Sequence, residues 1–282
     1  MVDLSFGTTS ARISRTGAEL KSLKADSVEY IWQGESGVWS GSSPVLFPIC
    51  GALKDNEYIY GGNTYKLSKH GFAMHKVFDI ERKTENSATF LLKADEQTKE
   101  VYPFDFEFRV TYTLSEAKLR VDYEIKNLSD YTMYFSVGAH EGYYLADGLL
   151  DYEIEFPQNE TLYTWLLKDG ALSDERKLIL NGGKVLPLKY EYFAEDALIL
   201  KGLKSKSAIL TPKQNGKRIK VSFPGFDYFL IWTVPKADFV CLEPWCGITD
   251  GIDHNKDIKI KEGINASEPG AVFLRTHTVE II

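Results

Sequence analysis

The chain has 282 residues, of which 44% are hydrophobic and 26% are charged, and a formal net charge of −7 at pH 7. This is ordinary globular composition, and an acidic chain without a block of lysine or arginine is a poor partner for nucleic acid or an anionic membrane. No charge-free segment reaches the length of a membrane span, and the N-terminus lacks the features of a signal peptide. We therefore expect a soluble, cytoplasmic protein with a small-molecule ligand.

The chain has three cysteines, Cys50, Cys241 and Cys246. They are too few and too irregularly spaced for a disulfide framework. The spacing of Cys241 and Cys246 also lacks the second pair of ligands that a structural zinc site would need. We expect reduced thiols, in keeping with a cytoplasmic protein.

The first hundred residues predict short strands and turns. Segment 1–40 has broken alternation with frequent turn signals, which is typical of an all-β protein. Segment 41–57 contains Pro44 and Pro48 in an apolar stretch, so we expect an ordered loop or an edge segment there. Tyr58–Leu67 predicts a hairpin that turns at Gly61-Gly62-Asn63.

The middle of the chain alternates strictly between apolar and polar residues. Phe104–Tyr112 and Leu119–Ile125 predict antiparallel strands with one solvated face. Further strands are expected over residues 150–235, with turns that include Asn181–Gly183. Helix is expected only after Glu96 and near Ser173–Arg176. The whole pattern predicts one domain over residues 1–282, a large antiparallel two-sheet β-sandwich of the all-β class.

A carboxylate follows the most apolar strand of the C-terminal region. Phe239–Leu242 leads directly into Glu243, and Pro244 is expected to end the strand there. A buried carboxylate is costly unless it is paired or used, so Glu243 either supports a turn or belongs to a functional site. Trp245, two residues on, offers a flat apolar surface suited to the C–H face of a sugar.

The chain has five histidines that could be partners for this carboxylate. His70 and His140 lie at strand ends beside glycines, and imidazole suits proton transfer near neutral pH. His75 is expected either in solvent or at the rim of a cleft. His254 lies in a charged loop, and His277 is expected to face outward from the last strand.

Other chemistries have weaker support in the sequence. His70 and His140 could form a metal site with Glu243 or Asp196 as the third ligand. Asp196 and Glu243 could be the two carboxylates of a glycosidase, although the two histidines would then have no role. Nucleotide-binding loops and the nucleophile elbow of serine hydrolases are absent from the sequence.

Four segments occur in an order that resembles a known family. They are Leu46–Gly51, Lys69–Ala73, Ser136–His140 and Leu242–Gly247. Together they resemble the aldose 1-epimerase (galactose mutarotase-like) family, in particular the LacX-like proteins of Gram-positive bacteria. The resemblance implies a β-supersandwich with a sugar cleft on one sheet. It also implies the interconversion of α and β anomers of free aldoses or, in one branch, of hexose 6-phosphates, without a cofactor or a metal.

The resemblance also implies roles for individual residues. Glu243 matches the general base, His140 the general acid and His70 the second cleft histidine. Asp196 matches the position that binds sugar hydroxyls. With Trp245 as the predicted sugar-facing indole, these residues form the expected site, and the expected partner is a small sugar bound by a monomer or a homodimer.

Two positions depart from the pattern of this family. Relatives have cleft arginines where this chain has Ala52 and Met74. The loss of two arginines, whose guanidinium groups bind phosphate well, argues against a hexose 6-phosphate as the substrate. It also leaves an alternative function, that of a carbohydrate-binding protein with weakened catalysis. Lys54, Asn56, His75 and Lys76 are the residues expected to compensate in binding the sugar.

Overall fold

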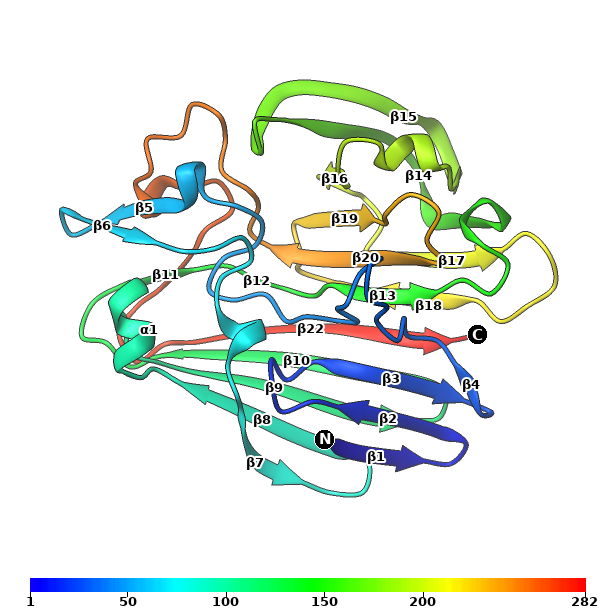
Figure 1. Ribbon diagram of the computed structural model, residues 1–282, viewed down its shortest axis with the longest axis horizontal. Coiled ribbons are helices and arrows are strands. Elements are labelled where there is room, and N and C mark those ends of the chain that lie inside the picture. Colours follow the sequence, from blue (N-terminus) through cyan, green and yellow to red (C-terminus); the bar gives the residue numbers. More distant parts are fainter.

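The structure is a computed structural model that describes residues 1–282, and nearly all of its regular structure is antiparallel strand (Figure 1). The N-terminal sheet consists of β1 (Val2–Phe6), β2 (Thr9–Ile13), β3 (Leu20–Ala25) and β4 (Val28–Glu29). It lies against β8 and β9 of a much larger sheet. The antiparallel all-β fold predicted from the sequence is confirmed.

The larger sheet has 14 strands. Its main path runs through β12 (Val137–Gly138), β20 (Phe239–Cys246), β19 (Tyr228–Trp232), β16 (Leu198–Lys201), β14 (Tyr152–Lys168), β17 (Ser207–Pro212), β18 (Ile219–Ser222), β22 (Val272–Ile281), β10 (Lys118–Asn127), β9 (Phe106–Ser115), β8 (Ser87–Lys93) and β7 (Asp79–Lys83). Off this path, β13 (Glu141–Tyr144) pairs with β20, and β15 (Ala171–Pro187) pairs with β14.

The remaining elements are small. Two two-stranded sheets pair β5 (Glu57–Tyr60) with β6 (Asn63–Lys66) and β11 (Met133–Phe135) with β21 (Asn265–Ser267). The helices are α1 (Glu96–Val101) and the 3-10 turns η1 (Lys54–Asn56), η2 (Ala73–His75), η3 (Leu149–Asp151), η4 (Tyr190–Phe193) and η5 (Ile258–Ile260). None of the helices is long and apolar enough to cross a membrane.

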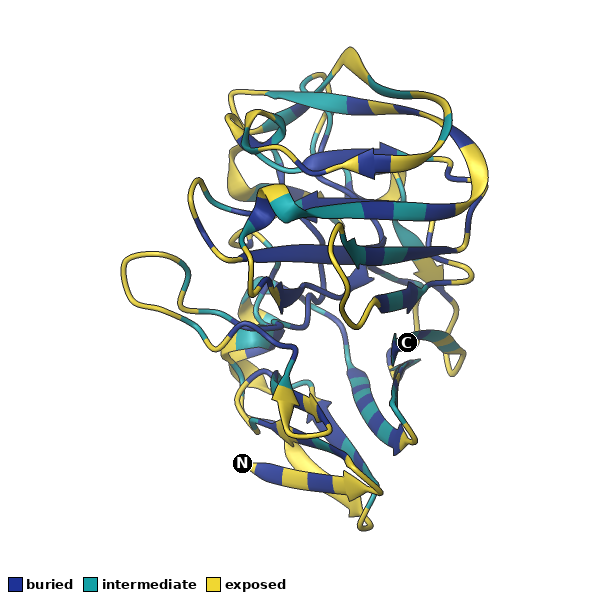
Figure 2. Ribbon diagram, turned by 90° about the vertical axis from the view of Figure 1, so that its right-hand side faces the viewer, coloured by how far each residue is buried: buried dark blue, intermediate teal, exposed yellow.

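The core follows the alternation seen in the sequence. On β9, Phe106, Phe108 and Val110 are buried while the residues between them are partly exposed, and β10 repeats the pattern. Buried and exposed positions alternate along the strands in Figure 2. These inward side chains join those of the N-terminal sheet and of β20 in one large apolar cluster. Burial of one face fixes the register of each strand, because a slip of one residue would expose that face.

The hairpin around residues 61–63 and the helix after Glu96 are confirmed as β5–β6 and α1. The helix begins at a capping box in which Asp95 and Thr98 bond to each other's backbone N–H groups.

The β14–β15 region was predicted wrongly. Both the expected helix at Ser173–Arg176 and the expected turn at Asn181–Gly183 lie within β15. Pairing with β14 satisfies the backbone of β15, and register shifts along the pair accommodate the glycines as bulges in a continuing strand.

Candidate active site

Strand β20 positions the carboxylate. Successive side chains of a strand point to opposite faces, and on β20 Val240 and Leu242 enter the main core. Cys241, Glu243 and Trp245 therefore share the opposite face. Glu243 is 1% exposed, at the base of a cleft rather than on the surface.

Pro244 does not end the strand, contrary to the expectation from the sequence. β20 continues to Cys246, and Pro244 pairs with Phe229 on β19. The Pro244 carbonyl accepts a hydrogen bond of 3.1 Å from the Ala139 N–H. On the edge of β20 that faces β12 and β13, β12 ends and β13 begins opposite Glu243 and Pro244. No strand therefore pairs with Pro244 on this edge, and the absence of a proline N–H leaves no strand-to-strand hydrogen bond unmade.

The cleft brings together five residues that the sequence analysis selected for the site. A cavity of about 220 Å³ is lined by Glu243, His140, His70, Asp196 and Trp245 among others. These residues come from β20, from the gap between β12 and β13, and from loops far apart in the sequence. The fold therefore assembles the predicted acid–base groups and the predicted indole around one small cavity.

His140 and Glu243 form a buried ionisable pair in the cleft. His140 Nε2 lies 3.4 Å from Glu243 Oε2, with both side chains almost fully buried. Burial raises the pKa of the Glu243 carboxyl well above its usual range. Burial also lowers the pKa of His140, to about 3. Burial therefore favours the uncharged form of each group, a carboxylic acid beside a neutral imidazole that have one exchangeable proton between them.

His70 is held in one tautomer. Its Nδ1 accepts a hydrogen bond of 3.1 Å from the Gly51 N–H, so the remaining ring proton lies on Nε2. Its backbone, in the left-handed region at φ 68°, donates to the Gly51 carbonyl at 2.8 Å. Burial, together with the charges of His140 and Lys69, lowers the pKa of His70 well below its usual range. His70 is thus a neutral donor, and its edge faces the His140 ring at 5.5 Å.

Three indoles form the apolar walls of the cleft. Trp245 Nε1 donates to the Ala139 carbonyl at 3.1 Å, which fixes the ring. The ring packs directly on Gly138, where a Cβ atom would lie 2.6 Å from the indole and 2.9 Å from the sulfur of a buried cysteine. Trp39 and Trp232 stand 5.3 Å and 5.6 Å from the His140 ring. Sequence reasoning missed both, although Trp232 lies on the strand next to β20, two residues beyond the partner of Glu243.

A lysine missed by sequence reasoning contributes a charge to the cleft. Lys69 Nζ lies 3.8 Å from Asp196 Oδ2, and both residues line the cavity. The other carboxylate oxygen of Asp196 accepts a hydrogen bond from the Ala197 N–H at 2.7 Å. The position of Lys69 directly before His70 was the available signal. Met74 also lines the cleft, whereas Ala52 lines a separate cavity.

The four residues expected to compensate for the missing arginines do not line the cleft. Lys54 and Asn56 border a separate cavity of about 310 Å³, His75 is exposed on η2, and Lys76 pairs with Asp95. Their predicted contact with a sugar in the cleft therefore has no support in the geometry. For Lys54 and Asn56 the reason is η1, which turns this segment toward the charged loop after β20.

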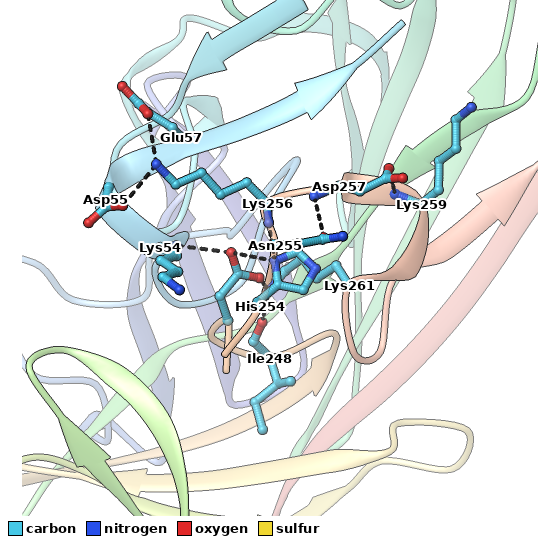
Figure 3. Close-up of polar contacts among 11 residues, drawn as sticks. Lys54, Asp55, Glu57, Ile248, His254, Asn255, Lys256, Asp257, Lys259 and Lys261 are labelled. Carbon is cyan, nitrogen blue, oxygen red and sulfur yellow. Dashed lines mark hydrogen bonds and ion pairs between the residues drawn. The ribbon is translucent and has the colours of Figure 1, made fainter. Parts of the chain in front are cut away.

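The charged loop after β20 is held by a buried ion pair between Asp250 and Lys261 (Figure 3). Asp250 accepts hydrogen bonds from Lys261 Nζ at 2.7 Å and from the Lys54 backbone N–H at 2.9 Å, and its other close neighbour is His254 at 3.4 Å. Lys256, nearer the surface, pairs with Asp55 and Glu57. Lys54 is therefore part of a structural cluster.

His277 was predicted to face outward, and this is wrong. It is fully buried, and its Nε2 lies 3.0 Å from Glu141 Oε1. The inward face of β22 includes His277, Val279 and Ile281. Glu141 from β13 supplies the buried polar partner, which a single strand pattern could not reveal.

Comparison with known proteins identifies the family. The family model described as aldose 1-epimerase matches residues 1–257. The chain belongs to the aldose 1-epimerase family. It is 32% identical over 281 residues to the plasmid-encoded protein LacX of Lactococcus lactis subsp. lactis, with 94% of each chain covered.

Solved structures support the same relationship. A galactose mutarotase related enzyme from Lactobacillus acidophilus superposes with a TM-score of 0.95 at 35% identity, covering 100% of this chain and 97% of that one. A galactose mutarotase-like protein from Lactobacillus casei also gives 0.95, at 29% identity with both chains fully covered. The galactose mutarotase-like fold and the LacX-like resemblance predicted from the sequence are confirmed.

Proposed function

We propose that this member of the aldose 1-epimerase family is a mutarotase that interconverts the α and β anomers of a free aldose. The observation that carries the proposal is the buried pair of His140 and Glu243, 3.4 Å apart at the base of a sugar-sized cleft. A carboxylate and an imidazole are the residue types that ring opening requires, one to accept a proton and one to donate it.

In the proposed reaction, Glu243 takes the proton of the anomeric O1–H while His140 donates a proton to the ring oxygen O5. The C1–O5 bond breaks and leaves an open-chain aldehyde with a hydroxyl at C5. Rotation about C1–C2 exposes the other face of the carbonyl, and the C5 hydroxyl then attacks it. His140 regains its proton, Glu243 returns a proton to O1, and the site is restored.

The single proton held by the pair suits this cycle. A carboxylate beside an imidazolium contains the same number of protons as the neutral pair that burial favours. The working state therefore requires only a proton shift between Glu243 and His140, without uptake from solvent. Sugar hydroxyls in the cleft would supply hydrogen bonds that stabilise the charged pair.

The rest of the cleft suits a neutral sugar. His70 presents one N–H donor, and Asp196 presents a carboxylate that can accept from hydroxyls. Lys69 is the only lysine or arginine that lines the cavity, and Asp196 neutralises much of its charge. A phosphate group is usually held by several charge-assisted donors, so this cleft favours an unphosphorylated aldose.

The direct test follows each pure anomer of several aldoses by polarimetry or proton NMR as it equilibrates. We expect the wild-type protein to accelerate at least one of them, and Glu243→Gln to lower that rate by about 10²–10⁴-fold while sugar binding survives. Glu116→Gln, at an exposed turn, is the matched control and should behave like wild type. An unchanged rate in Glu243→Gln would refute the role of Glu243. Binding without acceleration by wild type would instead favour the weakened, carbohydrate-binding alternative that Met74 suggests.

A further inference from the structure

A third donor atom converges on the proposed acid–base pair. The thiol of Cys241 shares the cleft-facing side of β20 with Glu243, and His140 lies across from both. One ligand atom from each residue lies within 4.8 Å of those of the other two, and all three residues are buried. We propose that His140, Cys241 and Glu243 form a binding site for a borderline-soft divalent cation such as Zn²⁺, and that the bound ion inhibits the enzyme.

The donor set selects the type of metal. One imidazole nitrogen, one thiolate sulfur and one carboxylate oxygen are all common ligands of Zn²⁺, and three protein ligands leave a fourth position open. The thiolate disfavours hard cations such as Mg²⁺ and Ca²⁺, which prefer oxygen ligands. Because His140 and Glu243 line the cavity, the open position faces the cleft.

The existing geometry is close to that of a tetrahedral site. Bonds of about 2.0–2.2 Å to nitrogen and oxygen at a tetrahedral angle place those two atoms about 3.3 Å apart. The observed separation of His140 Nε2 and Glu243 Oε2 is 3.4 Å. A Zn–S bond of about 2.3 Å requires the sulfur to lie about 3.6 Å from both. One ligand atom of each residue lies within 4.8 Å of those of the other two, so each distance to the sulfur needs to shorten by no more than about 1.2 Å.

An unsatisfied polar atom provides independent support. Glu243 Oε2 is buried without a hydrogen-bond partner. Such atoms are uncommon in folded proteins because each forgoes the hydrogen bonds it would make in water. A cation held at Glu243 Oε2 would supply the missing interaction for that atom, and thiol deprotonation would release a proton to solvent.

Inhibition follows from the identity of the ligands. An ion coordinated by the imidazole and the carboxylate occupies the lone pairs that the proposed proton transfers require. This consequence rests on the proposed function, whereas metal binding itself does not. The two parts can therefore be tested separately on the same protein.

The binding experiment uses Co²⁺ as a spectroscopic substitute for Zn²⁺. Protein treated with a chelator and desalted is titrated with Co²⁺, and the thiolate-to-cobalt charge-transfer band and the absorption of tetrahedral cobalt are recorded, followed by displacement with Zn²⁺. Cys246→Ala is the matched control, because Cys246 is a buried thiol on the same strand that packs into the main core. The test variant is Cys241→Ala. Circular dichroism and urea denaturation establish that it and Cys246→Ala fold, and Cys241→Ser replaces Cys241→Ala if Cys241→Ala does not fold.

We expect the band in wild type and in Cys246→Ala and its loss in the Cys241 variant. Removing a residue that merely orients a ligand weakens metal affinity about 10–100-fold, so losing the thiolate should raise the Zn²⁺ dissociation constant at least as much. Each protein's mutarotation rate is then compared with and without Zn²⁺, and only the Cys241 variant should resist inhibition. Absence of the band in wild type, or its persistence in the Cys241 variant, would overturn the site. A band without any mutarotase activity would leave the site standing and refute only the proposed function.

Discussion

His70 offers a way to separate substrate binding from proton transfer in this cleft. His70 lines the cleft, and its Nδ1 accepts from the Gly51 N–H, which leaves Nε2–H as the ring donor available to a ligand. Asn and Gln each reproduce one half of this arrangement. In His70→Asn, the amide oxygen can replace Nδ1 while no donor reaches the position of Nε2. In His70→Gln, the longer amide can reach that position while the acceptor for Gly51 is lost.

The expected magnitudes follow from those two hydrogen bonds. Loss of the cleft donor in His70→Asn should leave a sugar hydroxyl unsatisfied at a cost of about 1–3 kcal/mol, or about 5–150-fold in kcat/KM. His70→Gln should retain more activity but unfold more easily. A buried, unpaired Gly51 N–H costs about 1–3 kcal/mol, and glutamine tolerates the left-handed backbone at this position less well than asparagine does.

Anomer exchange measured by proton NMR across a range of pH, together with urea denaturation, checks both expectations. Because His70 is a neutral donor rather than a titrating acid, the shape of the pH profile of kcat/KM should be the same in His70→Asn and wild type. A lost or displaced limb in that profile would show that His70 transfers protons. Equal stability of the Asn and Gln variants would show that the Gly51 bond is not what holds the ring.

Three further substitutions test the surroundings of the site. Lys69→Met should raise KM by no more than about fivefold with little change in kcat, because a half-exposed ion pair contributes about 0–1 kcal/mol; a loss confined to kcat in steady-state assays would contradict this. Gly138→Ala should lower the free energy of unfolding by about 1–3 kcal/mol and reduce activity, since the new methyl group overlaps the indole beneath it. Gly251→Ala, which meets only an ordinary contact at 3.8 Å, is the control, and equal urea midpoints would refute the packing argument. Lys261→Met should destabilise by about 3–5 kcal/mol because it strands a buried carboxylate, whereas Lys256→Met on the surface should cost about 1 kcal/mol or less in the same urea titration.

Local patterns in the sequence predicted local structure well. Strict alternation located β9 and β10, and the glycine pair located the β5–β6 hairpin, because each signal depends on neighbouring residues only. The errors arose where distant pairing decided the outcome. Pro244 remains in a strand because the gap between β12 and β13 lies beside it, and His277 is buried because Glu141 meets it from another strand.

The site shows the same contrast between local sequence signals and contacts between distant segments. The structure brings Glu243, His140 and His70 together, and each of these residues belongs to one of the segments that resemble the family. The compensating residues were chosen by proximity along the chain. Lys54 follows the segment that contains Ala52, yet η1 carries it into a different polar cluster. Lys69 enters the cleft from a loop whose position depends on tertiary packing, and its place directly before His70 was the one signal for it in the sequence.

The elements that hold these groups differ in rigidity, and this difference bears on specificity. Glu243 lies on a strand with hydrogen-bonded neighbours on both sides, which fixes its carboxylate through the sheet. Asp196, Lys69 and Met74, in contrast, come from loops and a 3-10 turn, where substitutions and small backbone shifts are tolerated more readily. Under the proposed mechanism, a family built this way can change the sugar it holds while keeping its proton-transfer groups in place. Met74 stands where the family resemblance implies an arginine, so the proposed function predicts an altered grip on the sugar with Glu243 unmoved. A change of substrate therefore follows more directly from this cleft than a loss of proton transfer.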